Sequence, residues 1–144
     1  MNDMKTDLSK TLSISGRPGL YRYLAQGRNG IIAESFREGK REMFDIHSRV
    51  TTLADISIYT SEGELKLKEV FLALKGVLGD KPAPVAKDSE KELKALFGKA
   101  VPNYDADRFY VSHMKKIADW YNDLVRYASL DFAEEEQQTE NAEA

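Results

Sequence analysis

Closely spaced turn signals divide the first 60 residues of this sequence into short segments. Pro18 and Gly19 fit the two central positions of a type II turn, because proline fixes the first φ and glycine accepts the positive second φ. Asn29 followed by Gly30 is typical of a tight hairpin, and Gly39 marks a weaker third turn. Strands joined by turns this tight must be antiparallel neighbours.

The segments between these turns are rich in β-branched and aromatic residues, which predicts strands. A flat sheet of such short strands would expose its edges. We therefore expect the strands to curl into a small SH3-like barrel of five antiparallel strands spanning residues 12–60. The predicted strands cover residues 12–15, 20–26, 31–36, 42–46 and 55–60. Residues 1–11 are predicted to be a flexible N-terminus.

The next segment carries the apolar spacing of a helix. Ser61 and Glu64 match the capping-box pattern that begins many helices, so we predict a connecting helix over residues 61–78. Glycine and proline residues are then frequent in residues 79–88, which we interpret as a linker.

A helical domain is predicted over residues 89–130. Ser89 and Glu92 form a second capping box at the start of a short helix, which Gly98 is expected to end. Asp105 is the N-cap candidate of the last and longest helix. The predicted fold class is therefore α+β, with the five-stranded barrel followed by a three-helix unit.

The last helix has an unusually wide apolar face. Its apolar residues recur at alternating steps of four and three, and with their neighbours they cover about half of the helix circumference. They are Tyr110, Met114, Ile117, Tyr121, Leu124 and Ala128. A surface helix needs only a narrower stripe. We therefore expect this helix to be covered from two sides, by the other helices and by the barrel or a second chain.

Composition excludes several functional classes. The 144 residues include no cysteine, which rules out disulfides, thiolate nucleophiles and thiolate zinc sites. No apolar run approaches the roughly 18 residues of a membrane span, and residues 1–10 are too polar for the core of a signal peptide. We therefore expect a cytoplasmic protein without membrane contact.

The chain changes character at residue 131. Residues 131–144 contain six acidic side chains and no basic one, and they have no apolar partner, so we predict a disordered acidic tail. The formal charge of −3 belongs to this tail, because residues 1–130 hold 21 basic and 18 acidic side chains. The body of the protein, at +3, therefore remains compatible with an anionic partner.

The sequence offers few candidates for catalysis. His47 lies two residues after Asp45 on an expected strand, and Ser48 or Ser57 would complete a triad, but no nucleophile-elbow motif supports one. His113 borders the apolar face of the last helix and is expected to pack there. The two histidines also lack the spacing of a zinc site. We expect no enzymatic activity, no cofactor and no metal, and we identify no small-molecule substrate.

Two binding functions remain open, and the first is protein contact. His113, Trp120 and Tyr127 follow one another at seven-residue spacing along one edge of the last helix. Aromatic residues are enriched at the centres of protein interfaces. We therefore expect a non-enzymatic binding or adaptor protein, which contacts a protein partner or forms a homodimer through the helical unit and the barrel.

The alternative is a nucleic-acid-binding module for RNA or single strands. Small β-barrels offer aromatic rings for base stacking and a basic rim for phosphates. Residues 1–60 carry nine basic and seven acidic side chains, a modest net charge of +2. The candidate anion or nucleic-acid contacts are Arg17, Arg22, Arg28, Arg37, Lys40, Arg41, Tyr21 and Tyr23. The aromatic residues among them also fit a core or a protein contact.

Several distinctive strings extend over residues 12–130. They are Leu-Ser-Ile-Ser-Gly-Arg-Pro-Gly-Leu-Tyr from residue 12, Gln-Gly-Arg-Asn-Gly-Ile-Ile-Ala-Glu-Ser from residue 26, Thr-Leu-Ala-Asp-Ile-Ser-Ile-Tyr-Thr from residue 52, Val-Pro-Asn-Tyr-Asp-Ala-Asp-Arg-Phe-Tyr-Val-Ser-His-Met-Lys-Lys-Ile from residue 101, and Trp-Tyr-Asn from residue 120. With these strings the sequence resembles a Bacteroidetes family of small proteins defined as a domain of unknown function. The resemblance implies a small barrel-like N-terminal domain and a C-terminal helical module, and it brings no catalytic residues with it.

Overall fold

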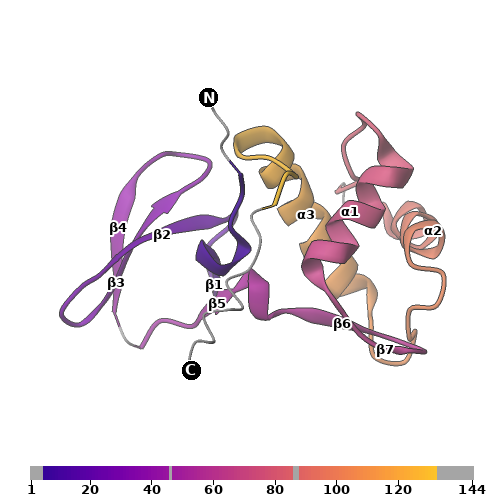
Figure 1. Ribbon diagram of the computed structural model, residues 1–144, viewed down its shortest axis with the longest axis horizontal. Coiled ribbons are helices and arrows are strands. Elements are labelled where there is room, and N and C mark those ends of the chain that lie inside the picture. The colour runs from indigo at the N-terminus through magenta and orange to yellow at the C-terminus, as the bar shows by residue number, and fades with distance from the viewer. Residues whose placement is uncertain (1–4, 46, 86–87, 133–144) are drawn as a thin grey trace, which may run out of the picture.

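A curved antiparallel sheet and a group of three helices make up the computed structural model, which describes residues 5–45, 47–85 and 88–132 (Figure 1). The five strands follow the order β4-β3-β2-β1-β5, and every neighbouring pair is antiparallel. They are β1 (Thr11–Ile14), β2 (Tyr21–Gln26), β3 (Gly30–Ser35), β4 (Arg41–Asp45) and β5 (Val50–Thr52). The predicted α+β class and the small five-stranded antiparallel sheet are confirmed. The sheet is barrel-like but open, because β4 and β5 form its two edges in the described part of the chain.

The glycines at the predicted turns play different roles. Gly19 has φ +80 and Gly39 has φ +69, so both use the backbone freedom that the turns require. Gly30 is different, because a Cβ at this position would lie 2.0 Å from the carbonyl oxygen of Phe44 on β4. The predicted hairpin is present, and Gly30 allows the close approach of two strands rather than a positive φ.

The predicted fifth strand at residues 55–60 is not the fifth strand of the sheet. That place is taken by β5, which pairs with β1 and is followed by the 3₁₀ turn η2 (Leu53–Asp55). Residues Ser57–Thr60 form β6 of a separate two-stranded sheet with β7 (Gly63–Lys66). Which strand pairs with β1 depends on distant contacts, and local composition does not reveal them.

The predicted capping box at Ser61 is wrong. Ser61 and Glu62 form the turn of the β6–β7 hairpin, in which the Thr60 hydroxyl donates to the carbonyl oxygen of Gly63 at 2.7 Å. Gly63 adopts φ +109, which a helix does not permit. Helix α1 (Leu67–Leu78) therefore begins after β7, at Leu67.

The observed bounds of the other two helices agree only in part with the predicted ones. Helix α2 (Glu90–Ala100) begins directly after Ser89, as predicted, but it continues through Gly98. Helix α3 (Val111–Tyr127) does not begin at Asp105. Asp105 instead begins a separate turn before α3, in which its Oδ1 accepts a hydrogen bond from the backbone N–H of Asp107 at 2.9 Å.

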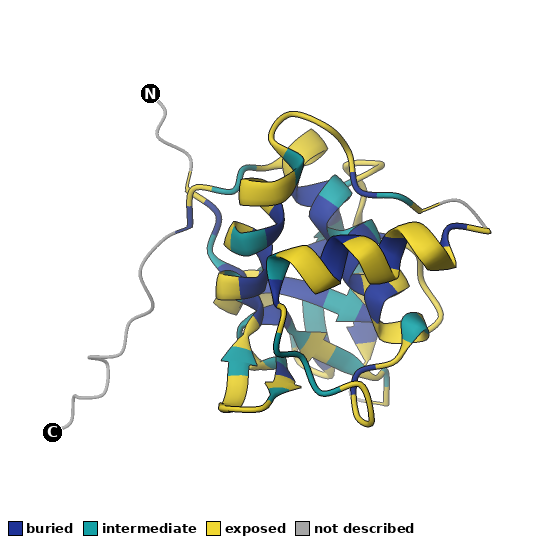
Figure 2. Cartoon of the chain, turned by 90° about the vertical axis from the view of Figure 1, so that its right-hand side faces the viewer, coloured by how far each residue is buried: buried dark blue, intermediate teal, exposed yellow. Residues whose placement is uncertain are grey.

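The main core lies between the helices and one side of the sheet. On α3 it contains Met114, Ile117, Tyr121 and Leu124, as the spacing predicts. The other two predicted residues flank the helix and are not buried, since Tyr110 is 55% exposed and Ala128 is also exposed. Leu20 and Leu53 from the sheet region join the same core. The outer faces of the helices are exposed and their inner faces buried (Figure 2). The two predicted units therefore share a core, and α3 is covered by both. None of the described helices has the length and apolar character needed to cross a membrane.

The first and the last described segments of the chain contribute to this core. Leu8 is buried, and the backbone N–H of Thr6 donates to the carbonyl oxygen of Asp131 at 2.9 Å. Phe132 stacks on Phe71 of α1 with ring centroids 6.1 Å apart. The predictions of a flexible segment over residues 1–11 and a disordered tail from residue 131 therefore do not hold for residues 5–11, 131 and 132. The rest of both segments lies outside the described residues.

Ala83, within the predicted linker at residues 79–88, is hydrogen-bonded to α3. The side chain of Asn122 accepts a hydrogen bond from the N–H of Ala83 at 2.8 Å and donates one to its carbonyl oxygen at 3.0 Å. Ala83 itself is buried. One amide side chain thus satisfies both backbone groups of a residue in an otherwise irregular segment.

Candidate protein-binding site

A stack of aromatic rings fixes the start of α3. The ring of His113 lies 6.1 Å from that of Phe109 and 5.2 Å from that of Tyr110. The Nδ1 atom of His113 accepts a hydrogen bond from the backbone N–H of Tyr110 at 3.1 Å. A ring nitrogen that accepts carries no proton, so the neutral ring holds its proton on Nε2. His113 is exposed and therefore offers an N–H donor to a partner.

A cavity of about 270 Å³ opens between β6 and the start of α3, and we call it the β6–α3 slot. The buried side chains of Ile58, Phe109 and Ile117 are apolar and form part of its wall. Trp120 is half-buried and lines the same cavity. The full lining is Ile56, Ser57, Ile58, Tyr59, Arg108, Phe109, His113, Lys116, Ile117 and Trp120.

The exposed part of the β6–α3 slot is positively charged. Arg108 and Lys116 both line it, and no residue of the lining carries a carboxylate. The guanidinium of Arg108 lies over the ring of Tyr59, 4.8 Å from its centroid, and its Nε is 3.7 Å from Oδ2 of Asp105. The slot therefore combines apolar and aromatic walls with cations that are still open to solvent.

The three predicted interface residues do not form one surface. His113 and Trp120 come together in the β6–α3 slot, but Tyr127 lines a different cavity of about 430 Å³. That second cavity also contains Lys10, Arg22 and Tyr23. Sequence reasoning placed Ile117 on the apolar face of the last helix but assigned neither Lys116 nor Ile117 to a binding site. Both follow His113, by three and four residues, and precede Trp120 on the same helix face.

Two of the candidate arginines, Arg17 and Arg22, form ion pairs with carboxylates of the sheet. Arg17 pairs with Glu42 and lies over the ring of Phe44, 5.1 Å from its centroid. Hydrogen bonding to this guanidinium lowers the pKa of Glu42 below its ordinary value. Arg22 pairs with Glu34 at 3.3 Å. Two of the predicted anion contacts are thus already neutralised within the sheet.

Arg37 connects the sheet to α3. Its Nε donates to Oδ1 of Asp123 at 3.1 Å, and its Nη2 donates to Oδ1 of Asp119 at 3.1 Å. Asp123 is only 4% exposed and also accepts a hydrogen bond from the N–H of Leu20. Burial raises the pKa of Asp123, and the hydrogen bond from Arg37 counteracts part of that increase. Arg37 therefore has a structural partner.

The remaining candidate contacts of the sheet are not gathered in one place. Arg28 lies in the turn between β2 and β3, whereas Lys40 lies in the turn between β3 and β4, at the opposite end of β3. Arg41 begins β4 and is exposed. Tyr21 is buried and packs edge-on against Phe44 with centroids 5.3 Å apart. Arg22 and Tyr23 line one cavity together.

The histidine and aspartate considered for catalysis form a local turn. Oδ1 of Asp45 accepts a hydrogen bond from the backbone N–H of His47 at 2.9 Å, and the Ser48 hydroxyl donates to the same atom at 3.4 Å. The carboxylate thus contacts the backbone of His47. Within the described ranges, no cluster of three or more histidine, aspartate and glutamate side chains has an arrangement that could hold a metal ion.

Comparison with known proteins identifies the two parts of the chain. Residues 8–53 match the domain of unknown function DUF5606, and residues 56–124 match the domain of unknown function DUF6852. The solution NMR structure of a protein from Bacteroides vulgatus matches with 37% sequence identity and a TM-score of 0.70, covering 89% of this chain and 98% of that chain. No curated protein matches the sequence. The chain therefore belongs to a Bacteroidetes-type family of small proteins that joins these two domains of unknown function.

Proposed function

We propose that this protein is a non-enzymatic binding protein, and that its β6–α3 slot receives an apolar side chain of a partner protein. The observation that carries this proposal is the arrangement of Trp120 and His113 beside the buried residues Ile58 and Ile117 in one cavity. Aromatic residues in partly desolvated pockets contribute most of the binding energy in many protein interfaces. The cytoplasmic location expected from the sequence remains part of this proposal.

The size of the slot favours a side-chain anchor over a whole small molecule. Its volume is about 270 Å³. Sites for small molecules are typically about 300–1,000 Å³ and enclose most of the ligand. A single large aliphatic or aromatic side chain of a partner needs less space and would bury the indole of Trp120.

The charge of the slot favours an acidic partner. Arg108 and Lys116 line it and no carboxylate does, and of the two Lys116 carries the greater weight because Nε of Arg108 is 3.7 Å from Oδ2 of Asp105. His113 adds the N–H donor of its Nε2, which suits a carboxylate oxygen. We therefore expect the anchoring side chain to be flanked by aspartate or glutamate, and complementary charge of this kind accelerates association and selects partners.

Nucleic-acid binding through the sheet is the weaker alternative. It draws support from Arg22 and Tyr23, which share a cavity with Lys10. Against it stand the pairing of Arg17 with Glu42 and the pairing of Arg22 itself with Glu34. Phosphate binding at these arginines would first require the loss of an ion pair.

A peptide-display selection against the full chain tests the proposal. Enriched peptides should carry a large apolar residue next to an acidic one. Synthetic copies should then change the fluorescence of Trp120, which is the only tryptophan in the sequence and reports directly on the slot. Mixed RNA and DNA oligonucleotides serve as the competing probe, since their binding would weaken steeply as salt is added.

Two lysines on α3 provide a matched pair of variants. Lys116→Glu should weaken peptide binding about tenfold or more, because it places a like charge beside the acidic flank. Lys115→Glu makes the same change on an exposed neighbour that does not line the slot, and it should leave the affinity unchanged. Equal effects of the two substitutions, or selected peptides that leave Trp120 fluorescence unaltered, would reject the slot as the binding site.

A further inference from the structure

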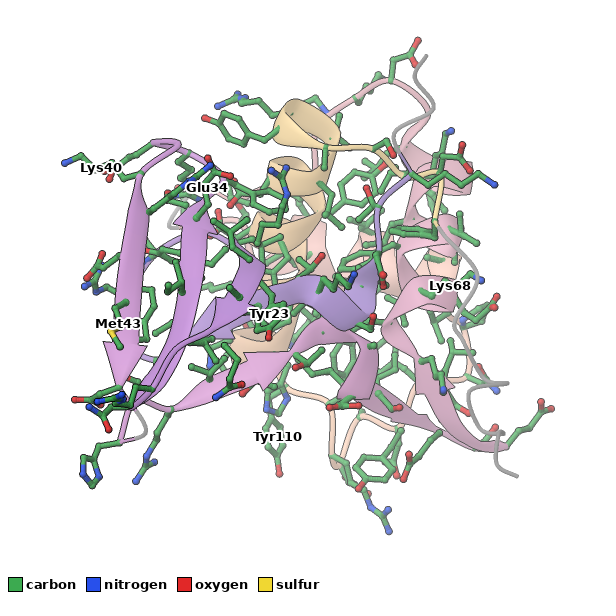
Figure 3. All side chains as sticks on the ribbon, turned by 60° about the vertical axis from the view of Figure 1, so that its left-hand side comes forward. Tyr23, Glu34, Lys40, Met43, Lys68 and Tyr110 are labelled. Carbon is green, nitrogen blue, oxygen red and sulfur yellow. The ribbon has the colours of Figure 1, made fainter. Side chains whose placement is uncertain are left out.

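The outer edge of β4 is a strand edge that the described part of the chain leaves without a pairing strand. β4 pairs with β3 on one side and is the last strand of the sheet. Figure 3 shows β4 at the margin of the sheet, with Met43 projecting there. Met43 is 49% exposed, which is unusual for a large apolar side chain on an edge strand. An exposed edge of this kind can template pairing with another strand.

The register of the β3–β4 hairpin determines which backbone groups point outward. The N–H of Ser35 donates to the carbonyl oxygen of Lys40 at 2.8 Å, so these two residues form a hydrogen-bonded pair. In an antiparallel hairpin, hydrogen-bonded pairs recur at every second residue along each strand. Glu42 and Phe44, opposite Ala33 and Ile31, therefore direct their backbone groups toward β3. Arg41, Met43 and Asp45 direct theirs toward the free edge, where the carbonyl oxygen of Asp45 also accepts the N–H of Ser48 at 3.0 Å.

The side chains of these same three residues share one face of the sheet. Successive residues of a strand alternate between faces, so Arg41, Met43 and Asp45 lie together. All three are exposed. Phe44, on the other face, is buried. The edge thus presents a positive, an apolar and a negative side chain in a row, with Met43 at the centre.

We propose that β4 pairs antiparallel with β4 of a second copy of this chain, about a two-fold axis at Met43. In that register each Met43 lies opposite the other, and Arg41 of each chain lies opposite Asp45 of the second copy. The outward-pointing backbone groups of Met43 meet those of the second Met43, as an antiparallel hydrogen-bonded pair requires. Sequence, backbone direction and charge all select this register. A shift by one position in each chain would place either Glu42 against Glu42 or Phe44 against Phe44 of the second copy, and in both registers Arg41 would no longer lie opposite Asp45.

The side chains of Arg41 and Asp45 are both available for this contact. Arg41 makes no ion pair with any described residue, since its cross-strand neighbour Glu34 is paired with Arg22. Oδ1 of Asp45 is held by the backbone of His47 and the hydroxyl of Ser48. These bonds fix the carboxylate, and Oδ2 has no partner in the described part of the chain.

The interface is small, so the dimer should be weak and visible only at high protein concentration. Sedimentation velocity and concentration-dependent NMR spectra of the full chain should show self-association. The amide of Met43 should become protected from hydrogen exchange as concentration rises. In a mixture of labelled and unlabelled chains, the Met43 methyl group should show contacts between chains.

Charge exchange gives the decisive test. Arg41→Asp and Asp45→Arg should each weaken self-association about tenfold or more, because each sets like charges opposite one another in both pairs. A mixture of the two variants should form a heterodimer, since every introduced charge then faces its opposite. The double variant Arg41→Asp/Asp45→Arg should regain homodimerisation for the same reason.

Lys91→Asp is the matched control, because it replaces a basic by an acidic side chain on an exposed residue of α2, which lies on the opposite side of the molecule from β4 (Figure 1). It should leave self-association unchanged. The proposal fails if the wild-type chain is monomeric at NMR concentrations, or if a dimer forms that Arg41→Asp and Lys91→Asp affect equally. It also fails if the two edge variants do not associate when mixed. The slot between β6 and α3 plays no part in this interface.

Discussion

The guanidinium of Arg37, in the turn after β3, donates its Nε–H to Oδ1 of the buried Asp123 on α3 at 3.1 Å. The other oxygen of Asp123 accepts the backbone N–H of Leu20 at 3.1 Å. One carboxylate thus binds two loops of the sheet to the longest helix. Gly19 makes room for this arrangement, because a Cβ there would lie 2.9 Å from Nε of Arg37. The sheet and the helices are therefore joined by a polar contact as well as by the shared core.

Removal of the Arg37 side-chain charge should destabilise the fold. Arg37→Gln leaves Asp123 buried with only its backbone donor, and we expect a loss of about 2 kcal/mol because Arg37 is itself partly exposed. Chemical denaturation monitored by circular dichroism measures the change. Arg22→Gln is the control, since it breaks the exposed pair with Glu34 and should cost under about 1 kcal/mol. Equal losses would show that Arg37 acts only as a surface charge.

The raised pKa of Asp123 predicts a pH dependence of stability. Burial raises this pKa above 3.8, so the folded protein binds the proton more tightly than the unfolded chain does. The contribution of Asp123 to stability is therefore greatest at low pH, and it falls as pH rises from 3.8 through the folded pKa. The difference in unfolding free energy between wild type and Asp123→Asn isolates this effect. NMR titration of the Asp123 carboxyl carbon checks the direction of the shift, and Arg37→Gln should raise the pKa further.

The contact between the C-terminal segment and α1 should contribute measurably to stability. Phe132 is 8% exposed and stacks on Phe71, so Phe132→Ala should cost about 2–3 kcal/mol, somewhat less than a fully enclosed phenylalanine. Val125→Ala on the exposed side of α3 should change stability by under about 0.5 kcal/mol. Thermal unfolding of both variants measures the difference. A small effect of Phe132→Ala would mean that residues near the C-terminus are not part of the core.

Local signals predicted the parts of the fold that depend on neighbouring residues. The turns at Gly19 and Gly39 and the hairpin at Gly30 positioned the first four strands, because turn chemistry restricts only a few successive residues. The pattern at Ser61 was misread, because a serine followed three residues later by a glutamate suits both a helix start and a strand after a tight turn. The positive φ of Gly63 decides between them, and it is visible only in the structure.

Of the candidate site, the part on α3 could be predicted from the sequence, and the part contributed by β6 could not. His113 and Trp120 lie seven residues apart on one helix, so their shared face follows from helical periodicity alone. Ile58 and Tyr59 reach the same slot from a hairpin more than 50 residues earlier in the chain, through the packing of β6 beside α3. The ion pair of Arg37 with Asp123 joins residues 86 positions apart, and no local pattern indicated that this arginine has a carboxylate partner.

The two glycines Gly98 and Gly30 should respond oppositely to alanine. Gly98 lies inside α2, where a Cβ would meet nothing within 4 Å, so Gly98→Ala should stabilise the protein by about 0.5–1 kcal/mol through higher helix propensity. Gly30→Ala places a Cβ 2.0 Å from the carbonyl oxygen of Phe44 and should separate β3 from β4, at a cost of about 3 kcal/mol or more. Denaturant midpoints measure both changes, and amide NMR spectra locate them. If Gly98→Ala destabilises the chain, α2 ends at the glycine in solution, as the sequence signal suggests. If Gly30→Ala is neutral, the close approach of the two strands is not required.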